Sequence, residues 1–388
     1  MLRPVLRRTP TIASRVLSDR TGHQVWLKCE NLQRTGSFKP RGAYYRIRNL
    51  TPAERERGVV AASAGNHAQG VAWAATELGC AATVFMPVNA PLPKYVATKS
   101  YGATVHLTGQ TVDDALVAAH EFAAQTGAIL IHPFDHADVV AGQATVGLEI
   151  LEQVPDVGTI VVPTGGGGLV AGIAAAAPDV RVVGVQAESA AAWPDSLQAG
   201  RPTRTQQMST MADGIAVGLP GEVPFAHVAK YVDAVLTVSE DALSRALLLC
   251  MERAKLIVEP AGAAGVAALL SCRAVDLDLR GPVVVVLSGG NIDPLLLTHV
   301  ITHGLRATGR YLAVRVTVPD RPGGLANLLS VVGASGASVL DVVHSRTAGK
   351  LALDEVEVSL TVETRGPAHR EDVLSALADH GFVVAVQD

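Results

Sequence analysis

Hydrophobic residues follow one pattern over most of the chain and a different pattern near its end. From about residue 25 to residue 305, short runs of consecutive apolar residues alternate with alanine-rich stretches of helical length, as in GVVAAS followed by NHAQGVAWAATELG. Strands that are apolar at every position are typical of a parallel sheet covered by helices on both faces. The pattern therefore predicts an α/β fold with parallel sheets, in which ligands bind at the loops after the carboxyl ends of the strands.

The pattern changes after Arg310. The segment YLAVRVTVP alternates as a half-buried strand, and a helix, two strands, a helix and a last strand follow over about 78 residues. The order β-α-β-β-α-β predicts a ferredoxin-like domain at residues 311–388, separate from a first domain at residues 1–308. The alternation slips between Leu353 and Val356, which predicts a β-bulge there.

Composition and charge restrict the class of protein. The 388 residues have a formal net charge of −4 and no basic, aromatic-rich patch, so we expect neither nucleic acid nor an anionic membrane as a partner. The N-terminal stretch lacks a secretory apolar core, and no apolar run is long enough to cross a membrane, so we expect a cytoplasmic protein. The four cysteines stand far apart, as expected for free thiols in a reducing compartment. They are Cys29, Cys80, Cys250 and Cys272.

Lys39, in the segment ENLQRTGSFKPRGA, is the first candidate for chemistry. The chain has only seven lysines against 25 arginines. A lysine, unlike an arginine, can lose its proton in a protein and can then form a Schiff base. The alternative is a surface lysine in a turn, because the glycine, serine and proline around it are turn formers.

The loop from Ser63 to Gly70, SAGNHAQG, follows an apolar strand and begins a helix. Ser63 and Asn66 can donate hydrogen bonds, Gly65 lets the backbone approach a ligand, and a helix N-terminus favours negative charge. We therefore expect a substrate carboxylate at this loop. The alternative is an ordinary helix N-cap, which requires a single serine or asparagine.

Two further strand-end loops are rich in glycine. In PTGGGGLVAG, residues 163–172, four consecutive glycines expose backbone N–H groups, which suits a phosphate. No Lys-Ser or Lys-Thr pair follows, and the dinucleotide fingerprint does not fit in strict register. In VVVVLSGGN, Ser288 stands at a strand end, where its hydroxyl either contacts a flat ligand or belongs to a simple turn.

A reactive amine, a phosphate site, a carboxylate pocket and a hydroxyl partner together suit one cofactor, pyridoxal 5′-phosphate, a phosphorylated aldehyde held by a lysine. With TGSFKPRGA, SAGNHAQG, TGGGGL and LSGGN in this order, residues from about 8 to 305 resemble the threonine dehydratase (threonine ammonia-lyase) family. The relatives of that family are serine dehydratases and serine racemases of the tryptophan-synthase-β-like fold, fold type II. The motif VPDRPGGLANLL resembles an ACT domain, a module that commonly binds amino acids.

The resemblance implies an architecture and a set of site residues. It implies two α/β lobes, the smaller at about residues 38–135 inserted in the larger, with the cofactor between them. It also implies that Lys39 holds the cofactor as a Schiff base and later removes the α-proton of the substrate as a general base. The remaining assignments are cofactor or substrate contacts: Phe38 beside the ring, Asn66 at the 3′-oxygen, Gly165, Gly166, Gly167, Gly168 and Leu169 at the phosphate, Ser288 at the ring nitrogen, and Ser63, Asn66 and His67 at the substrate carboxylate. Glu259 matches an acid near the ring whose role stays open.

Two positions depart from the serine racemases that resemble this family. Those enzymes carry a second serine, which acts as a base, where this chain has Ala64. An alanine has no proton to give or take, which argues against racemisation. The same enzymes bind a divalent cation through two acids six residues apart. Glu188 matches the first, but Pro194 stands at the second, so we expect no metal site.

These features lead to a specific functional hypothesis. We expect a β-elimination that converts L-threonine to 2-oxobutanoate and ammonia, as the first step of isoleucine biosynthesis, with L-serine as a slower substrate, in a homodimer or homotetramer. The ACT resemblance implies an amino-acid effector, which a place in isoleucine biosynthesis would make isoleucine or valine, unless the module only joins subunits. The expected effector loop is Pro322, Gly323, Gly324 and Leu325. The alternatives are a serine-preferring or catabolic L-serine/L-threonine dehydratase, a serine racemase and a non-catalytic amino-acid sensor.

Overall fold

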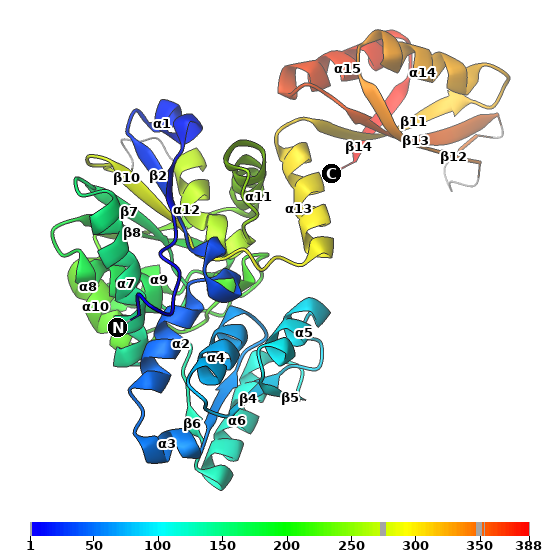
Figure 1. The fold of residues 1–388 in the computed structure, drawn as a ribbon. Coiled ribbons are helices and arrows are strands. Elements are labelled where there is room, and N and C mark those ends of the chain that lie inside the picture. Colours follow the sequence, from blue (N-terminus) through cyan, green and yellow to red (C-terminus); the bar gives the residue numbers. More distant parts are fainter. Residues whose placement is uncertain (1, 272–276, 347–350, 353, 388) are drawn as a thin grey trace. The chain divides into compact units, whose positions relative to one another are not determined.

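The computed structural model describes residues 2–271, 277–346, 351–352 and 354–387. The chain divides into two compact units, Met1–Leu297 and Thr298–Asp388, which are coloured blue to yellow and yellow to red in Figure 1. The first unit holds two sheets and the second unit holds one. Helix α13 (Pro294–Ala307) includes the boundary between the units. None of the helices that the structure describes combines the length and the apolar character that a membrane-spanning segment needs.

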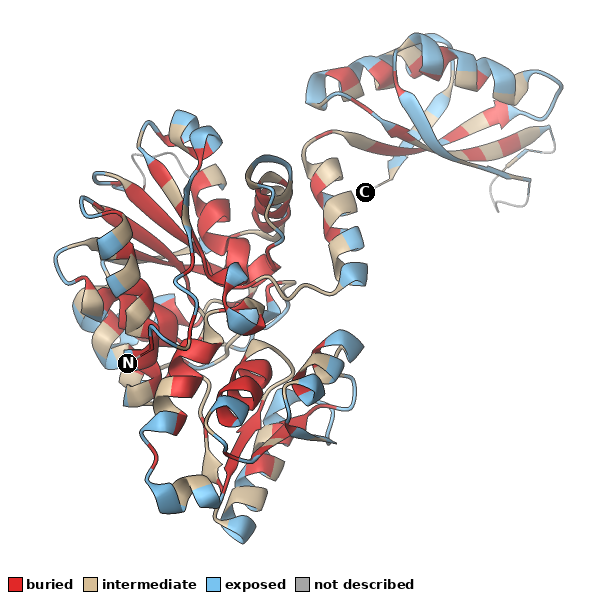
Figure 2. Cartoon of the chain, viewed as in Figure 1, coloured by how far each residue is buried: buried red, intermediate tan, exposed pale blue. Residues whose placement is uncertain are grey.

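The larger sheet of the first unit has the strand order β1-β2-β10-β7-β8-β9. The β1–β2 pair is antiparallel and the other neighbours are parallel. Every residue of β7 and β10 is buried, and Figure 2 shows buried residues gathered in the strands and on the helix faces beside them. The strands are β1 (Thr11–Ala13), β2 (Val25–Cys29), β7 (Thr159–Pro163), β8 (Arg181–Ala187), β9 (Ala234–Val238) and β10 (Val283–Leu287). The continuously apolar runs are thus parallel strands, as predicted.

The smaller sheet has the order β5-β4-β3-β6, and all its neighbours are parallel. Its strands are β3 (Val59–Ala62), β4 (Ala82–Met86), β5 (Thr104–Leu107) and β6 (Ile129–Leu130). All four lie in the chain between β2 and β7 of the larger sheet, so this lobe interrupts the larger one.

Helices cover both sheets (Figure 1). Those associated with the smaller sheet are α2 (Lys39–Arg48), α3 (Pro52–Glu56), α4 (Asn66–Glu77), α5 (Leu92–Ser100) and α6 (Val112–Thr126). Those that follow or precede strands of the larger sheet are α1 (Arg15–Thr21), α7 (Ala137–Gln153), α8 (Gly168–Ala176), α9 (Trp193–Ala199), α10 (Glu222–Tyr231), α11 (Glu240–Leu249) and α12 (Pro260–Ser271).

Helix α2, which begins with Lys39, is held closely by its neighbours α4 and α7. A Cβ atom added to Gly70 of α4 would lie 3.1 Å from the carbonyl carbon of Lys39. One added to Gly142 of α7 would lie 2.5 Å from the carbonyl oxygen of Arg41. Glycine at these positions lets both helices approach the backbone of α2, so the start of α2 is fixed by direct backbone packing.

A buried ion cluster anchors the same helix. The guanidinium of Arg41 contacts Glu30 (Nε–Oε2, 2.7 Å) and Glu149 (Nη1–Oε1, 2.8 Å), and the Nζ of Lys28 lies 2.6 Å from Glu149 Oε2. The Arg41 and Glu30 side chains are 1% and 0% exposed. Burial opposes the charge of Arg41, but Glu30 and Glu149 outweigh it and hold the pKa of Arg41 above its ordinary value. Removal of one partner would leave an uncompensated buried charge, so the cluster keeps α2 in one position.

The second unit is a four-stranded antiparallel sheet of order β12-β13-β11-β14 with α14 and α15 on one face (Figure 1). Its elements are β11 (Tyr311–Pro319), α14 (Gly324–Ala334), β12 (Ser338–Ser345), β13 (Glu355–Glu363), α15 (Pro367–Asp379) and β14 (Val383–Gln387). This order is the predicted βαββαβ, and with the parallel sheets of the first unit it confirms the fold class. The bulge predicted after Leu353 begins at a residue outside the described part of the chain. The described register shift lies in β12, between Val339 and Asp341.

Candidate active site

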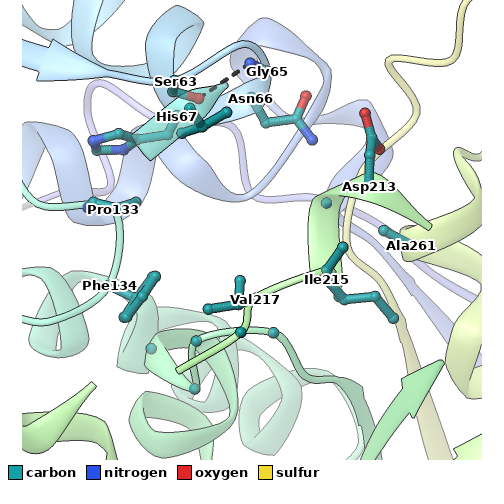
Figure 3. A pocket seen from close by; sticks show the side chains of 18 of the residues that line it. Ser63, Gly65, Asn66, His67, Pro133, Phe134, Asp213, Ile215, Val217 and Ala261 are labelled. Atoms are coloured by element: carbon teal, nitrogen blue, oxygen red, sulfur yellow. Dashed lines mark hydrogen bonds between the residues drawn. The ribbon is translucent and has the colours of Figure 1, made fainter. Parts of the chain in front are cut away.

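A cavity of about 670 Å³ lies at the carboxyl ends of strands from both sheets of the first unit. Ser63 follows β3, Thr164 follows β7 and Ser288 follows β10, which is the edge where parallel sheets bind ligands. The site residues predicted for the first domain all line this cavity: Phe38, Lys39, Ser63, Asn66, His67, Gly165, Gly166, Gly167, Gly168, Leu169 and Ser288. Figure 3 shows the Ser63–His67 loop on one side of the cavity and Ile215 and Val217 on the other.

The amine of Lys39 lies inside this cavity. Its Nζ donates a hydrogen bond to the carbonyl oxygen of Pro133 at 3.1 Å and lies 5.1 Å from the centre of the Phe38 ring. Burial disfavours the ammonium form and lowers the pKa of Lys39 from 10.5 to about 8, although Glu259 opposes the shift. At pH 7 about one tenth of such an amine is neutral, against about 0.03% of an ordinary lysine. Lys39 is therefore prepared for nucleophilic and base chemistry near neutral pH.

The loop at residues 165–168 consists of glycines because the structure leaves no room for side chains at these positions. A Cβ atom on Gly166 would lie 2.4 Å from the ring of Phe134, and one on Gly167, whose φ is +97°, would lie 2.3 Å from Trp193. The loop leads into α8, whose first N–H groups have no carbonyl partner within the helix. Phe134 and Trp193 thus hold the loop so that its backbone N–H groups are free to bind an anion.

The Ser63–His67 loop is fixed by its own hydrogen bonds. The Oγ of Ser63 accepts from the N–H of Gly65 at 3.1 Å (Figure 3). The Nε2 of His67 lies 2.7 Å from the carbonyl oxygen of Ile131. Burial, followed by the charge of Lys39, lowers the pKa of His67 to about 3, so its ring is neutral and Nε2 donates to that carbonyl. His67 therefore fixes the loop to the end of β6, and its Nε2–H is not available to a substrate carboxylate.

Glu259, whose role the sequence leaves open, is a buried partner of Asn66. The Nδ2 of Asn66 donates to Oε1 of Glu259 at 2.6 Å. Burial raises the pKa of Glu259 to about 7, and the nearby charge of Asp213 adds to the shift, while Lys94 and Asn66 oppose it. Glu259 is thus an acceptor for the amide of Asn66 and lines the cavity beside it.

An ion pair between Lys94 and Asp213 lies at the same cavity and escaped prediction. The Nζ of Lys94, on α5 of the smaller lobe, is 2.6 Å from Oδ2 of Asp213, which belongs to a short turn of the larger lobe. The two residues are 119 positions apart, and neither stands in a recognisable motif. The scarcity of lysine in the chain is the one signal that could have drawn attention to Lys94.

Ser288 joins the Lys39 segment to β10. Its carbonyl oxygen accepts from the N–H of Phe38 at 3.1 Å, and Ser37 and Gly289 form an antiparallel bridge. Its side chain lines the cavity, and no residue in the described part of the chain hydrogen-bonds to its hydroxyl. That hydroxyl is available to a ligand.

The two residues considered for a divalent-cation site, Glu188 and Pro194, lie just beyond the end of β8. Glu188 begins a short turn after β8, and Pro194 lies in the first turn of α9. Among the residues that the structure describes, no group of three or more histidine, cysteine, aspartate or glutamate side chains is arranged so that it could hold a metal ion.

Comparison with known proteins identifies the class. The family model of pyridoxal-phosphate-dependent enzymes matches residues 2–289, and the ACT-domain model matches residues 313–382. The chain therefore belongs to the family of pyridoxal-phosphate-dependent enzymes and carries an ACT domain at its C-terminal end. The predicted cofactor is confirmed.

Particular relatives narrow the class further. The L-threonine ammonia-lyase of Thermotoga maritima is 46% identical over 390 residues, which cover 99% of this chain and 96% of that protein. The catabolic L-threonine dehydratase of Staphylococcus aureus is 44% identical over 310 residues, or 78% of this chain and 90% of that protein. The structure of a threonine deaminase from Solanum lycopersicum matches with a TM-score of 0.74 and 37% identity, covering 77% of this chain and 88% of that one. The resemblance to the threonine dehydratase family is confirmed.

The cavity residues fit pyridoxal phosphate. The Lys39 amine is the group that an aldehyde requires, and the glycine loop presents backbone N–H groups with no room for side chains. The hydroxyl of Ser288, without a partner among the described residues, provides a polar contact for the ring. Lys39, residues 165–169 and Ser288 would hold the cofactor.

We predict that Gly167→Ala weakens pyridoxal phosphate binding by at least about tenfold, because the new methyl group would displace the loop or Trp193 at a left-handed backbone position. Gly200→Ala is the matched control, because Gly200 has φ +66° and open space around its Cβ position. Equilibrium dialysis of the cofactor with both variants measures the effect. Equal dissociation constants for the two variants would contradict the proposed phosphate site.

Proposed function

We propose that the protein is a threonine ammonia-lyase, which converts L-threonine to 2-oxobutanoate and ammonia by β-elimination. The observation that carries the proposal is the half-buried amine of Lys39, whose pKa is lowered, in a cavity that is also lined by the four-glycine loop. The relative from Thermotoga maritima, which matches 99% of the chain, bears the same activity in its name, and this supports the choice of substrate.

The residues of the cavity support each part of this reaction. When bound, pyridoxal phosphate supplies an electron sink for the negative charge that develops at the substrate α-carbon. The loop at the start of α4, with the hydroxyl of Ser63, holds the substrate carboxylate. The remaining N–H of Asn66 would contact the cofactor. The neutral Nζ of Lys39 takes the α-proton, and the β-hydroxyl leaves with a proton as water. The enamine that is released takes up water and yields 2-oxobutanoate and ammonia.

Ser288 favours elimination over other reactions of the same cofactor. At the position proposed for the ring nitrogen it offers a hydroxyl, which does not hold a proton on that nitrogen as a carboxylate would. The electron sink is therefore weaker, which suffices for a β-elimination but suits long-lived carbanions less well.

Three alternative functions are open to test. A serine-preferring or catabolic dehydratase is the nearest, and one relative is named as a catabolic enzyme. A serine racemase is disfavoured because Ala64, which lines the cavity, cannot act as a second base. A non-catalytic amino-acid sensor is disfavoured because the amine of Lys39 lines the cavity with a lowered pKa, which a pure binding site does not require.

We predict that Lys39→Ala lowers the rate of 2-oxobutanoate formation from L-threonine by about 10³-fold or more, because the variant loses the amine that supplies both the covalent and the base functions. Lys99→Ala, at an exposed lysine outside the cavity, should retain the wild-type rate. The assay follows 2-oxobutanoate, with pyruvate from L-serine measured in parallel. A higher kcat/KM for L-serine would favour the serine-preferring alternative, and retained activity in Lys39→Ala would contradict the proposal.

We further propose that the ACT domain binds isoleucine or valine as an effector, which would place the enzyme in isoleucine biosynthesis. We also propose that the enzyme is a cytoplasmic homodimer or homotetramer. The proposed loop, Pro322 to Leu325, leads into α14, whose N-terminus favours a carboxylate. Gly323 has φ +91° and open space around its Cβ position. Asp320, at the start of the loop, is paired in two hydrogen bonds with Arg346.

We predict that Gly323→Asp abolishes the effect of L-isoleucine on the L-threonine saturation curve, because a carboxylate at the start of α14 would repel the effector carboxylate. Gly323→Asn is the matched control, since asparagine has nearly the same shape, tolerates a positive φ and lacks the charge. Initial rates with and without L-isoleucine or L-valine measure the effect. Inhibition that persists in the aspartate variant would place the effector elsewhere, and no response in the wild type would leave the domain as a subunit contact.

A further inference from the structure

Asn291, three residues beyond Ser288, connects the Lys39 segment with the Asn66 loop. Its Nδ2 donates to the carbonyl oxygen of Thr35 at 2.6 Å and to Oδ1 of Asn66 at 2.8 Å. Both hydrogens of this amide are therefore used, one on each side. Asn66 continues the chain of hydrogen bonds by donating from Nδ2 to Oε1 of Glu259.

The contact with Thr35 falls on an unusual backbone. Thr35 has φ +58° and ψ +12°, a left-handed conformation that β-branched residues rarely adopt, and Gly36 follows with φ +74°. A Cβ atom on Gly36 would lie 2.4 Å from Oδ1 of Asn291, so glycine is required for Asn291 to sit there. The N–H of Gly290 also donates to the carbonyl oxygen of Gly36 at 2.9 Å. The loop after β10 thus holds the left-handed turn that precedes Lys39.

The contact with Asn66 determines which way that amide faces. Because Oδ1 of Asn66 accepts from Asn291, the Asn66 nitrogen must face Glu259 and the cavity. One N–H of Asn66 donates to Glu259, and the second remains for a ligand. Figure 3 shows the Asn66 side chain extending from the start of α4 into the cavity. With Oδ1 unsatisfied, the amide could turn over and present an acceptor where a donor is needed.

We propose that Asn291 is a positioning residue that fixes the side-chain amide of Asn66 with its N–H toward the cofactor and at the same time holds the turn before Lys39. The inference rests on the proposed cofactor contact of Asn66. Asn291 itself does not line the cavity, so it acts through its neighbours and not on the reacting atoms.

Asn291→Asp tests the proposal, because a carboxylate of nearly the same shape cannot donate to Thr35 or to Asn66. We expect this variant to raise the dissociation constant of pyridoxal phosphate at least about tenfold and to change the absorption spectrum of the bound cofactor. Asn31→Asp is the matched control: Asn31 is also a buried amide that donates to a main-chain carbonyl, that of Ile257 at 3.0 Å. It should lower the thermal midpoint without a comparable change in cofactor affinity.

A double-mutant cycle separates positioning from general destabilisation. If Asn291 acts through Asn66, the tenfold effect of Asn291→Asp should become smaller in an Asn66→Ala background, where only the part carried by the contact with Thr35 remains. The same effect in both backgrounds, or an unchanged affinity in Asn291→Asp, would overturn the proposal. If the aspartate variant does not fold, Asn291→Ala, which adds no charge, replaces it in the same cycle, and the same two outcomes would overturn the proposal. Cofactor affinity is measured without substrate, so the result is independent of whether L-threonine is the substrate.

Discussion

The partial burial of the Lys39 amine, in a cavity lined largely by backbone and apolar groups, is the constraint on which the rest of the site depends. Burial lowers the pKa of this amine to about 8, and the same burial raises the pKa of Glu259 to about 7. Both shifts require a cavity with few polar partners for charged groups, and both weaken if the lobes admit water. The site keeps its chemistry only while the backbone at the start of α2 stays in place.

The structure holds that backbone from several sides. Glycines on α4 and α7 let those helices contact α2 directly, and Arg41 joins the helix to two buried carboxylates. The bridge between Ser37 and Gly289 ties the preceding residues to the end of β10. A rigid frame of this kind keeps a reactive side chain in one geometry, which is more effective than a mobile loop for covalent chemistry.

Much of the fold and of the site could be predicted because both rest on local patterns. Apolar strands alternating with alanine-rich helices indicate parallel sheets, and a strand-end loop rich in glycine or serine must lie at their ligand-binding edge. The roles of residues that depend on contacts between distant segments could not be predicted from such local patterns. The Nε2–H of His67 donates to a main-chain carbonyl, and Lys94 pairs with Asp213 from a distant segment. Glu259 is recognisable from the sequence, but its contact with Asn66 becomes visible only in the structure. The left-handed turn at Thr35 is likewise invisible, because threonine is an unusual residue for it.

The most direct test of the account is the pH dependence of cofactor uptake by the cofactor-free protein. With a Lys39 pKa lowered to about 8, the neutral amine is the minority form below this pH and the majority above it. The uptake rate should rise about tenfold from pH 6 to pH 7 and level off above about pH 8, whereas the reaction of the same cofactor with Nα-acetyllysine, an amine of ordinary pKa, should still rise between pH 9 and pH 10. A rate that still rises in proportion to hydroxide between pH 9 and pH 10 would show that the amine of Lys39 titrates as an ordinary lysine, and would contradict the account.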